Sequence, residues 1–132
     1  MERVKEIMEW LNTIDENSSL EVKKGDKVEK SFLESVNAFS NEPNLNGGLI
    51  VLGIEREEHS LFPSYKVTGV SNPDQIQSDI ATQCASMFNI PIRPVVEVEM
   101  VGDKAVVKVK VEELSPERKP LYFKIHTNSL SY

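Results

Sequence analysis

The chain has 132 residues, 39% of them hydrophobic and 27% charged, which suits a single globular domain with its own core. Its formal net charge of −6 excludes a protein whose whole surface clamps nucleic acid, because such binding depends on Lys and Arg neutralising phosphates. The lone Cys84 excludes an intrachain disulfide and a cysteine-based zinc site. The sequence has no long apolar run and no signal-peptide core, so we expect a soluble, cytoplasmic protein.

The first half of the chain predicts helices alternating with strands. Apolar residues at three- and four-residue spacing predict a helix over 4–14, and alternation predicts a half-buried strand over 20–23. A second apolar stripe predicts a helix over 27–40. The stretch 44–55 contains an uninterrupted apolar run bounded by glycines, so we expect a central strand that is covered on both faces.

The second half predicts a short strand, a helix and a hairpin. Residues 65–70 indicate the strand, and the helix begins at Pro73 and continues its apolar face to Phe88. A two-residue turn at Gly102 and Asp103 sets a hairpin register, and the last strand is expected over 120–125. Together these elements predict an α/β (α+β) domain, with a mixed sheet of about six strands, three helices and a β-hairpin near the C-terminus.

The hairpin register assigns each side chain to a face. It pairs Met100 with Ala105, Val98 with Val107 and Val96 with Val109, all on one face. On the other face Glu97 lies opposite Lys108, with Glu99 diagonal to it. We therefore interpret the lysine row of the second strand as a solvated, salt-bridged face in preference to a phosphate-binding ribbon.

The stretch "ENSSLEVKK" is the main candidate for chemistry. Glu16 and Glu21 lie five residues apart across a loop and a strand, and two close carboxylates would bind Mg²⁺ or Mn²⁺. Such a metal activates water for phosphodiester cleavage, with Lys23 or Lys24 holding the phosphate and Glu55 as the third carboxylate. The structural alternative is that Glu16 caps or precedes the strand and Glu21 pairs with a lysine on its exposed face.

Other motifs indicate structure more than catalysis. Gly47 and Gly48 lead from a helix into a strand, the reverse of a phosphate-binding loop, so they predict a tight turn and close packing. His59 and His126 have no obvious catalytic partner and are interpreted as surface residues. Cys84 lies on an apolar helix face, which predicts a small core thiol.

Several of these stretches occur in an order that resembles the Schlafen AlbA-like domain family. The resemblance covers nearly all of 16–125 and rests on "ENSSLEVKK", "SVNAFSN", "NGGLIVLGIE", "YKVTGV", "GDKAVVKVKVEE" and "KPLYFKI". Its most specific parts are the Glu16, Glu21, Lys23 pattern and the end of the second helix, where Ala38, Phe39 and Asn41 precede the glycines.

The resemblance implies a DNA-binding α/β domain from the N-terminus of bacterial transcriptional regulators and divergent AAA proteins. In animal Schlafen proteins, similar domains cleave RNA with two glutamates, matching Glu16 and Glu21, and an aspartate after the glycine-ended strand. Here that position holds Arg56, which cannot ligate a metal. The metal site is therefore incomplete unless Glu55 or Glu57 takes the place of the aspartate. The chain also stops before a segment with an Arg-Gly pair, so 1–132 is expected to be a single domain from a longer multidomain protein.

Three functions follow from these observations. The leading one is a non-catalytic nucleic-acid-binding domain, with DNA favoured over RNA and a local phosphate-contacting patch of Lys23, Lys24, Lys27 and Arg56. The second is a Mg²⁺- or Mn²⁺-dependent endoribonuclease that uses Glu16 and Glu21. The third is a protein-interaction or oligomerisation module, which the negative charge favours. We expect no membrane partner. The C-terminal domains of the longer protein are expected partners.

Overall fold

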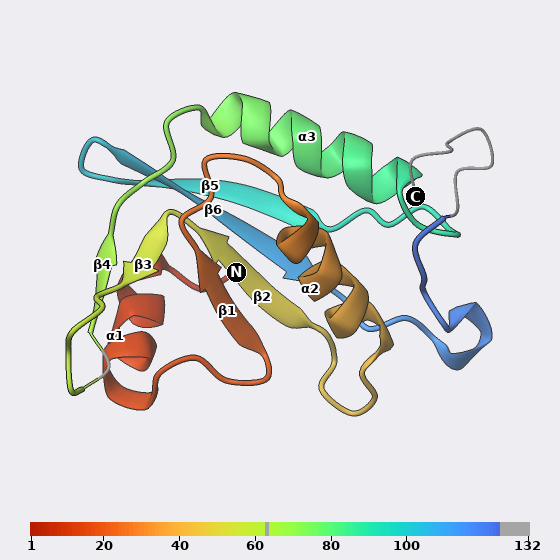
Figure 1. Cartoon of the computed structure of the whole chain (residues 1–132), viewed down its shortest axis with the longest axis horizontal. Helices are drawn as coiled ribbons and strands as arrows, with labels where there is room; N and C mark the ends of the chain where they lie inside the picture. Colours follow the sequence, from red (N-terminus) through yellow and green to blue (C-terminus); the bar gives the residue numbers. More distant parts are fainter. Residues whose placement is uncertain (63, 125–132) are drawn as a thin grey trace.

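The computed structural model describes residues 1–62 and 64–124 and has the predicted α+β architecture (Figure 1). Its helices and strands are, in chain order, α1 (Val4–Ile14), β1 (Leu20–Lys23), α2 (Lys30–Asn41), β2 (Gly48–Leu52), β3 (Ile54–Arg56), β4 (Tyr65–Val67), α3 (Pro73–Ser86), β5 (Val95–Val101) and β6 (Lys104–Val111). A short 3₁₀ turn, η1 (Pro116–Arg118), follows β6.

The sheet is mixed, as predicted. Its four strands have the order β1-β2-β6-β5, with β1 and β2 parallel and the other neighbours antiparallel. β3 and β4 form a separate two-stranded antiparallel sheet. β2 is therefore an inner strand, and β1 and β5 are the two edges.

The stretch 44–55, predicted as one strand, contains β2 and most of β3, because the chain turns at Gly53. Gly53 has a φ of +102°, a conformation that favours glycine, and a Cβ there would lie 3.1 Å from the carbonyl oxygen of Ala105. Its N–H donates to the Lys23 carbonyl, and its own carbonyl accepts the N–H groups of Thr68 and Gly69, each at 2.9 Å. The turn lets β3 leave the main sheet and pair with β4.

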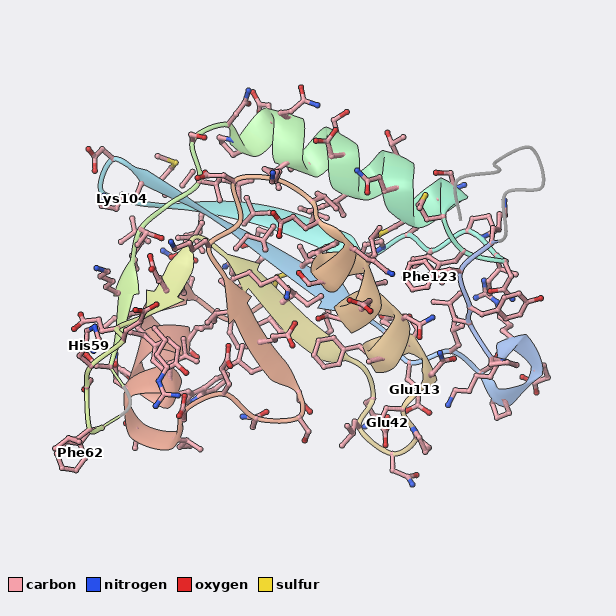
Figure 2. The ribbon with its side chains drawn as sticks, in the orientation of Figure 1. Glu42, His59, Phe62, Lys104, Glu113 and Phe123 are labelled. Carbon is pink, nitrogen blue, oxygen red and sulfur yellow. The ribbon has the colours of Figure 1, made fainter. Side chains whose placement is uncertain are left out.

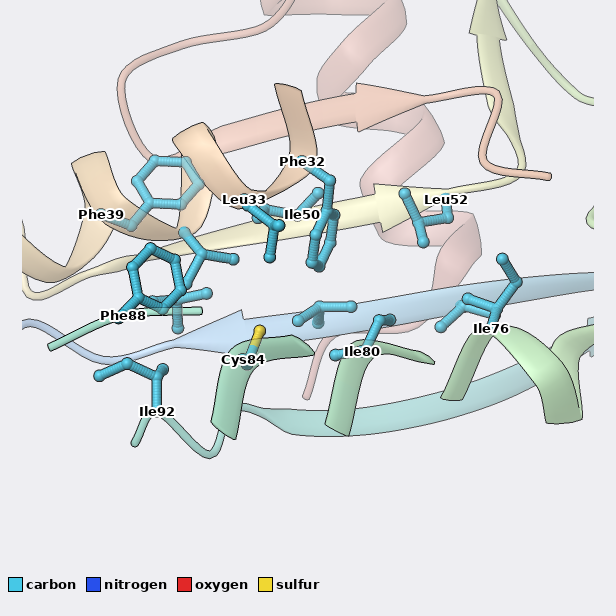
Figure 3. Close-up of a cluster of buried hydrophobic side chains, with 14 of the residues drawn as sticks. Phe32, Leu33, Phe39, Ile50, Leu52, Ile76, Ile80, Cys84, Phe88 and Ile92 are labelled. Carbon is cyan, nitrogen blue, oxygen red and sulfur yellow. The ribbon is translucent and has the colours of Figure 1, made fainter. Parts of the chain in front are cut away.

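Two apolar clusters bury the two faces of the main sheet. On one face α2 and α3 pack against Ile50 and Leu52, and Figure 3 shows Phe32, Ile80 and Cys84 in that cluster. On the other face α1 packs against Leu49 and Val51. The residues of β2 thus alternate between two cores, which explains its continuous apolar sequence.

Cys84 is the core thiol that the sequence predicts. Its side chain is fully buried, and burial raises the pKa of the thiol to about 11. A thiol in that environment stays protonated at neutral pH and is a poor nucleophile.

The predicted hairpin register is confirmed, but the expected solvated face is wrong at its centre. Glu97 lies opposite Lys108 as predicted, yet the Lys108 side chain is completely buried. The start of α1 covers it: Lys108 Nζ donates to the Glu2 carbonyl at 2.8 Å and contacts Glu99 at 2.8 Å and Glu97 at 3.3 Å. Glu99 in turn accepts the N–H of Val4, so this buried ion pair fixes α1 on the hairpin.

The predicted final strand is also wrong over 120–124, which makes only an isolated bridge between Phe123 and Phe88. The peptide groups of Leu121 bond to side chains at the end of α2 instead of to a strand. Its N–H donates to Asn41 Oδ1 at 2.7 Å, and its carbonyl accepts from the amides of Asn37 and Asn41 at 2.8 and 2.9 Å. Residue 125 lies outside the described residues.

Candidate nucleic-acid interface

A lysine-rich loop connects β1 to α2 where the parallel strands β1 and β2 end. Lys23 is the last residue of β1, and Lys24 and Lys27 follow in the loop. Gly25 holds the loop against β2: its φ is +80°, and a Cβ there would lie 2.5 Å from Leu52 Cβ. The loop and the start of α2 line a pocket of about 420 Å³, with all three lysines at its rim or wall.

The three lysines do not form a purely positive surface, because each lies near a carboxylate. The nitrogen–oxygen distances are 3.5 Å for Lys23 and Glu21, 3.5 Å for Lys24 and Glu55, and 3.8 Å for Lys27 and Glu29. The side chains of Lys24 and Lys27 are nevertheless 74% and 77% exposed, whereas that of Lys23 is 22% exposed. Ion pairs this exposed are weak, so the two loop lysines are available to another anion.

The fourth predicted cation, Arg56, lies at the end of β3 beside Asp15. Its guanidinium is 3.3 Å from Asp15 Oδ2 and lies over the ring of Tyr65, 6.0 Å from the ring centre. The side chain is about half exposed. Arg56 is therefore a surface cation held in place by one carboxylate and one aromatic ring.

Asp15 organises this part of the surface and was not predicted from the sequence. Its carboxylate accepts hydrogen bonds from the Tyr65 hydroxyl and from the N–H of Glu16. The bond from Tyr65 and then the bond from Glu16 lower the pKa of Asp15; burial opposes them, and the charge of Arg56 adds a smaller lowering. Burial, together with the bond to Asp15, raises the pKa of Tyr65 to about 12. The only sequence signal was an acidic residue directly after the first predicted helix.

The predicted carboxylates each contact a different partner. Glu16 Oε1 accepts the N–H of Val22 at 2.8 Å and so covers the free edge of β1. Glu21 Oε2 accepts the Ser35 hydroxyl on α2 and pairs with Lys23, while Glu55 pairs with Lys24. In these contacts Glu16 supports the edge strand, and Glu21 and Glu55 each neutralise a lysine.

A divalent cation places strict demands on its ligands. Mg²⁺ and Mn²⁺ need several oxygens directed at one point, about 2.0–2.2 Å from it. In residues 1–62 and 64–124, no three carboxylate, imidazole or thiol groups converge in that way. As arranged in this structure, Glu16, Glu21 and Glu55 therefore do not fit a three-carboxylate metal centre.

The remaining motif residues lie away from the lysine loop. Figure 2 shows His59 with Phe62 on the loop between β3 and β4, where both side chains are exposed. Gly47 makes the predicted tight turn, with a φ of +83°, and Gly48 packs on Phe39. His126 lies outside the described residues.

Among the described residues, none of the helices combines the length and apolar character needed to cross a membrane.

Comparison with known proteins identifies the family. The family model described as Schlafen, AlbA_2 matches residues 16–130. The solved structures include a similar one, the solution NMR structure of the N-terminal domain of a RecG-related protein from Nitrosomonas europaea. It is 37% identical, with a TM-score of 0.85, and the match covers 95% of this chain and 82% of that one. Comparison with curated protein sequences gives no significant match. The chain therefore belongs to the Schlafen, AlbA_2 family, as its motifs predict.

Proposed function

We propose that this domain binds the phosphate backbone of nucleic acid, without cutting it, through Lys23, Lys24, Lys27 and Arg56. The observation that carries the proposal is the pocket between the end of β1 and the start of α2, which is lined by the three loop lysines and by two carboxylates, Asp26 and Glu29. A local cluster of lysines reconciles an acidic chain with a polyanionic ligand, because affinity for the backbone depends on the few cations in contact.

The ion pairs around the loop define how binding would occur. A phosphate that approaches Lys27 replaces the exposed Glu29, and one that approaches Lys24 replaces the half-buried Glu55; both lysines are themselves exposed, so the phosphate does not have to enter a fully buried pair. Because exposed pairs are worth about 1 kcal/mol or less, this exchange costs little. The displaced carboxylates then repel a nucleic-acid strand in any other position, which restricts the path of its phosphate backbone across the domain.

We further propose that DNA is preferred to RNA and that the domain is the N-terminal part of a longer bacterial regulatory protein that acts in the cytoplasm on DNA. The similar Nitrosomonas domain supports this, since it is itself an N-terminal domain, of a protein named as related to the ATP-dependent DNA helicase RecG. The two domains are 37% identical over most of both chains.

The test is a fluorescence anisotropy titration of labelled duplex DNA, single-stranded DNA and single-stranded RNA. The wild type is compared with Lys23→Ala/Lys24→Ala and with the charge-matched control Lys5→Ala/Lys104→Ala, whose lysines are exposed and far from the loop in sequence. The proposal predicts tightest binding to duplex DNA and a loss confined to the Lys23/Lys24 variant. Equal binding by both double variants would overturn it.

The same samples test the nuclease alternative. Mn²⁺ is added and the nucleic acids are run on a denaturing gel, with Glu21→Gln as the comparison. We expect intact strands, because the three glutamates contact separate partners. Cleavage that Glu21→Gln abolishes would mean that the carboxylates rearrange around a metal, and the domain would be an enzyme.

A further inference from the structure

A second pocket lies at the other end of the main sheet. It has a volume of about 450 Å³ and forms where the residues before β5 meet those after β6. Lys110, which lines it, pairs with Leu49 at the start of β2, whereas Lys23 pairs with Leu52 at the end of that strand. The two pockets share no lining residue, so this one stands apart from the lysine loop.

Three exposed cations line this pocket: Arg93, Lys110 and Arg118. Unlike the lysines of the loop, none of them forms an ion pair with any described carboxylate. Residues 63 and 125–132 contain no aspartate or glutamate that could serve instead. Three exposed cations thus line one concavity without forming an ion pair with a described side chain.

Two glutamates also line the pocket, and their contacts decide its net charge. Glu113, labelled in Figure 2, is bound by Lys119 Nζ at 2.7 Å, and its pKa is lowered mainly by that hydrogen bond. Its charge is therefore already balanced by a lysine outside the set of three. Glu112 alone opposes Arg93, Lys110 and Arg118, so the pocket keeps an excess of positive charge.

Buried anchors hold the walls of the pocket in place. The N–H of Ile92 donates to the carbonyl of Cys84 on α3, and the N–H of Leu114 donates to that of Ser40 on α2, both at 2.9 Å. Ile92 and Leu114 are themselves buried. Because the backbone is already ordered, a ligand would immobilise only the ends of the three cationic side chains.

We propose that this pocket binds a phosphate group, carried by a free nucleotide or by a nucleic-acid strand. Arginine presents paired N–H donors that match phosphate oxygens, and lysine adds a third positive donor from another direction. A tetrahedral phosphate offers acceptors in all of these directions, whereas a carboxylate is satisfied by a single arginine. The volume lies within the range of small-molecule sites, about 300–1,000 Å³.

The test is a ¹H–¹⁵N NMR titration of the domain with inorganic phosphate, with ADP and with a short single-stranded DNA. The proposal predicts saturable shifts of the amides around Arg93, Lys110 and Arg118. Arg93→Gln/Arg118→Gln should weaken that binding about tenfold or more, since two charge-assisted contacts are lost. The charge-matched control Lys5→Gln/Lys104→Gln should bind as the wild type does.

The three ligands separate the two sources of phosphate. Shifts with ADP support a nucleotide site, and shifts with DNA alone support a backbone site. Lys23→Ala/Lys24→Ala should leave the pocket shifts intact, so the proposal can hold even if the loop fails to bind nucleic acid. It is overturned if none of the ligands shifts these amides, or if Arg93→Gln/Arg118→Gln binds as tightly as the control.

Discussion

Replacing the buried Lys108 with methionine should destabilise the domain by separating α1 from the hairpin. The side chain is fully buried and contacts the Glu2 carbonyl, Glu97 and Glu99. Methionine keeps most of the volume but leaves Glu99 without its closest cation. Removing one partner of a fully buried pair costs about 3–5 kcal/mol.

The environment of Glu99 sets where in that range the effect should lie. Its side chain is 14% exposed and keeps the hydrogen bond from Val4 N–H and the ion pair with Arg3 at 3.3 Å. Partial access to water lowers the cost, so we expect Lys108→Met to lose about 2–3 kcal/mol of the free energy of unfolding. For a domain of this size that corresponds to a Tm lower by about 10 °C.

Urea denaturation followed by circular dichroism measures the free energy of unfolding directly. Lys104→Met is the control, because Lys104 is an exposed residue at the start of the same strand, at the hairpin tip in Figure 2. The double variant Lys108→Met/Glu99→Gln removes the stranded charge and should recover about 1 kcal/mol relative to Lys108→Met. A free energy of unfolding for Lys108→Met within about 0.5 kcal/mol of that of the control would contradict a stabilising role for the buried ion pair.

Three further perturbations probe the same structure. Burial raises the pKa of Glu99, but bonds and charges from Lys108, Val4 and Arg3 bring it below 4.5 overall. The stabilisation from the Glu99 carboxylate is therefore complete above about pH 4.5 and is lost as the pH falls through the folded pKa. In urea denaturation, the free energy of unfolding of Glu99→Gln should therefore fall less than that of the wild type as the pH is lowered. Tyr65→Phe should remove a phenol that titrates near pH 12 in ultraviolet absorbance. Because the ordinary pKa of this phenol is 10.0, the stability that Tyr65 contributes is complete below about pH 10 and is lost as the pH rises toward 12. Gly25→Ala should lower the free energy of unfolding by about 1–3 kcal/mol in the same denaturation assay, because a Cβ would lie 2.5 Å from Leu52 Cβ at a φ of +80°.

The hairpin was predictable to the residue because all of its determinants are local. A two-residue turn at Gly102 and Asp103, followed by strict alternation, permits one register that buries the apolar set. The burial of Lys108 was not predictable in the same way. Alternation assigns Lys108 to a face of the sheet, but it does not show that α1, about 100 positions away in sequence, packs on that face and buries the side chain.

The remaining differences have similar causes. Gly53 ends one strand and begins another because of contacts with Lys23 and Gly69, which an apolar run does not reveal. Residues 120–124 look like a strand by composition, yet asparagine side chains of α2 satisfy the Leu121 peptide groups. In both places a non-local hydrogen-bond partner overrides a local preference.

The candidate site was predictable in its residue types more than in its pairings. The cluster of glutamates and lysines is evident in the sequence, and the lysines do gather at the end of β1. Which carboxylate neutralises which cation depends on Glu55 of β3 and on the residues next to α1 and α2, Asp15 and Glu29. The pairing of Arg56 with Asp15 shows this, because the two residues lie 41 positions apart and the role of Asp15 was not predicted.

The most direct test of the central proposal is the salt dependence of duplex DNA binding. If the lysine loop contacts phosphates, the logarithm of affinity should fall linearly with that of salt concentration, by about 0.9 per phosphate contacted. Lys23→Ala/Lys24→Ala should reduce this slope by about 1.8, and Lys5→Ala/Lys104→Ala should leave it unchanged. A slope that is the same in the wild type and in Lys23→Ala/Lys24→Ala would contradict the account.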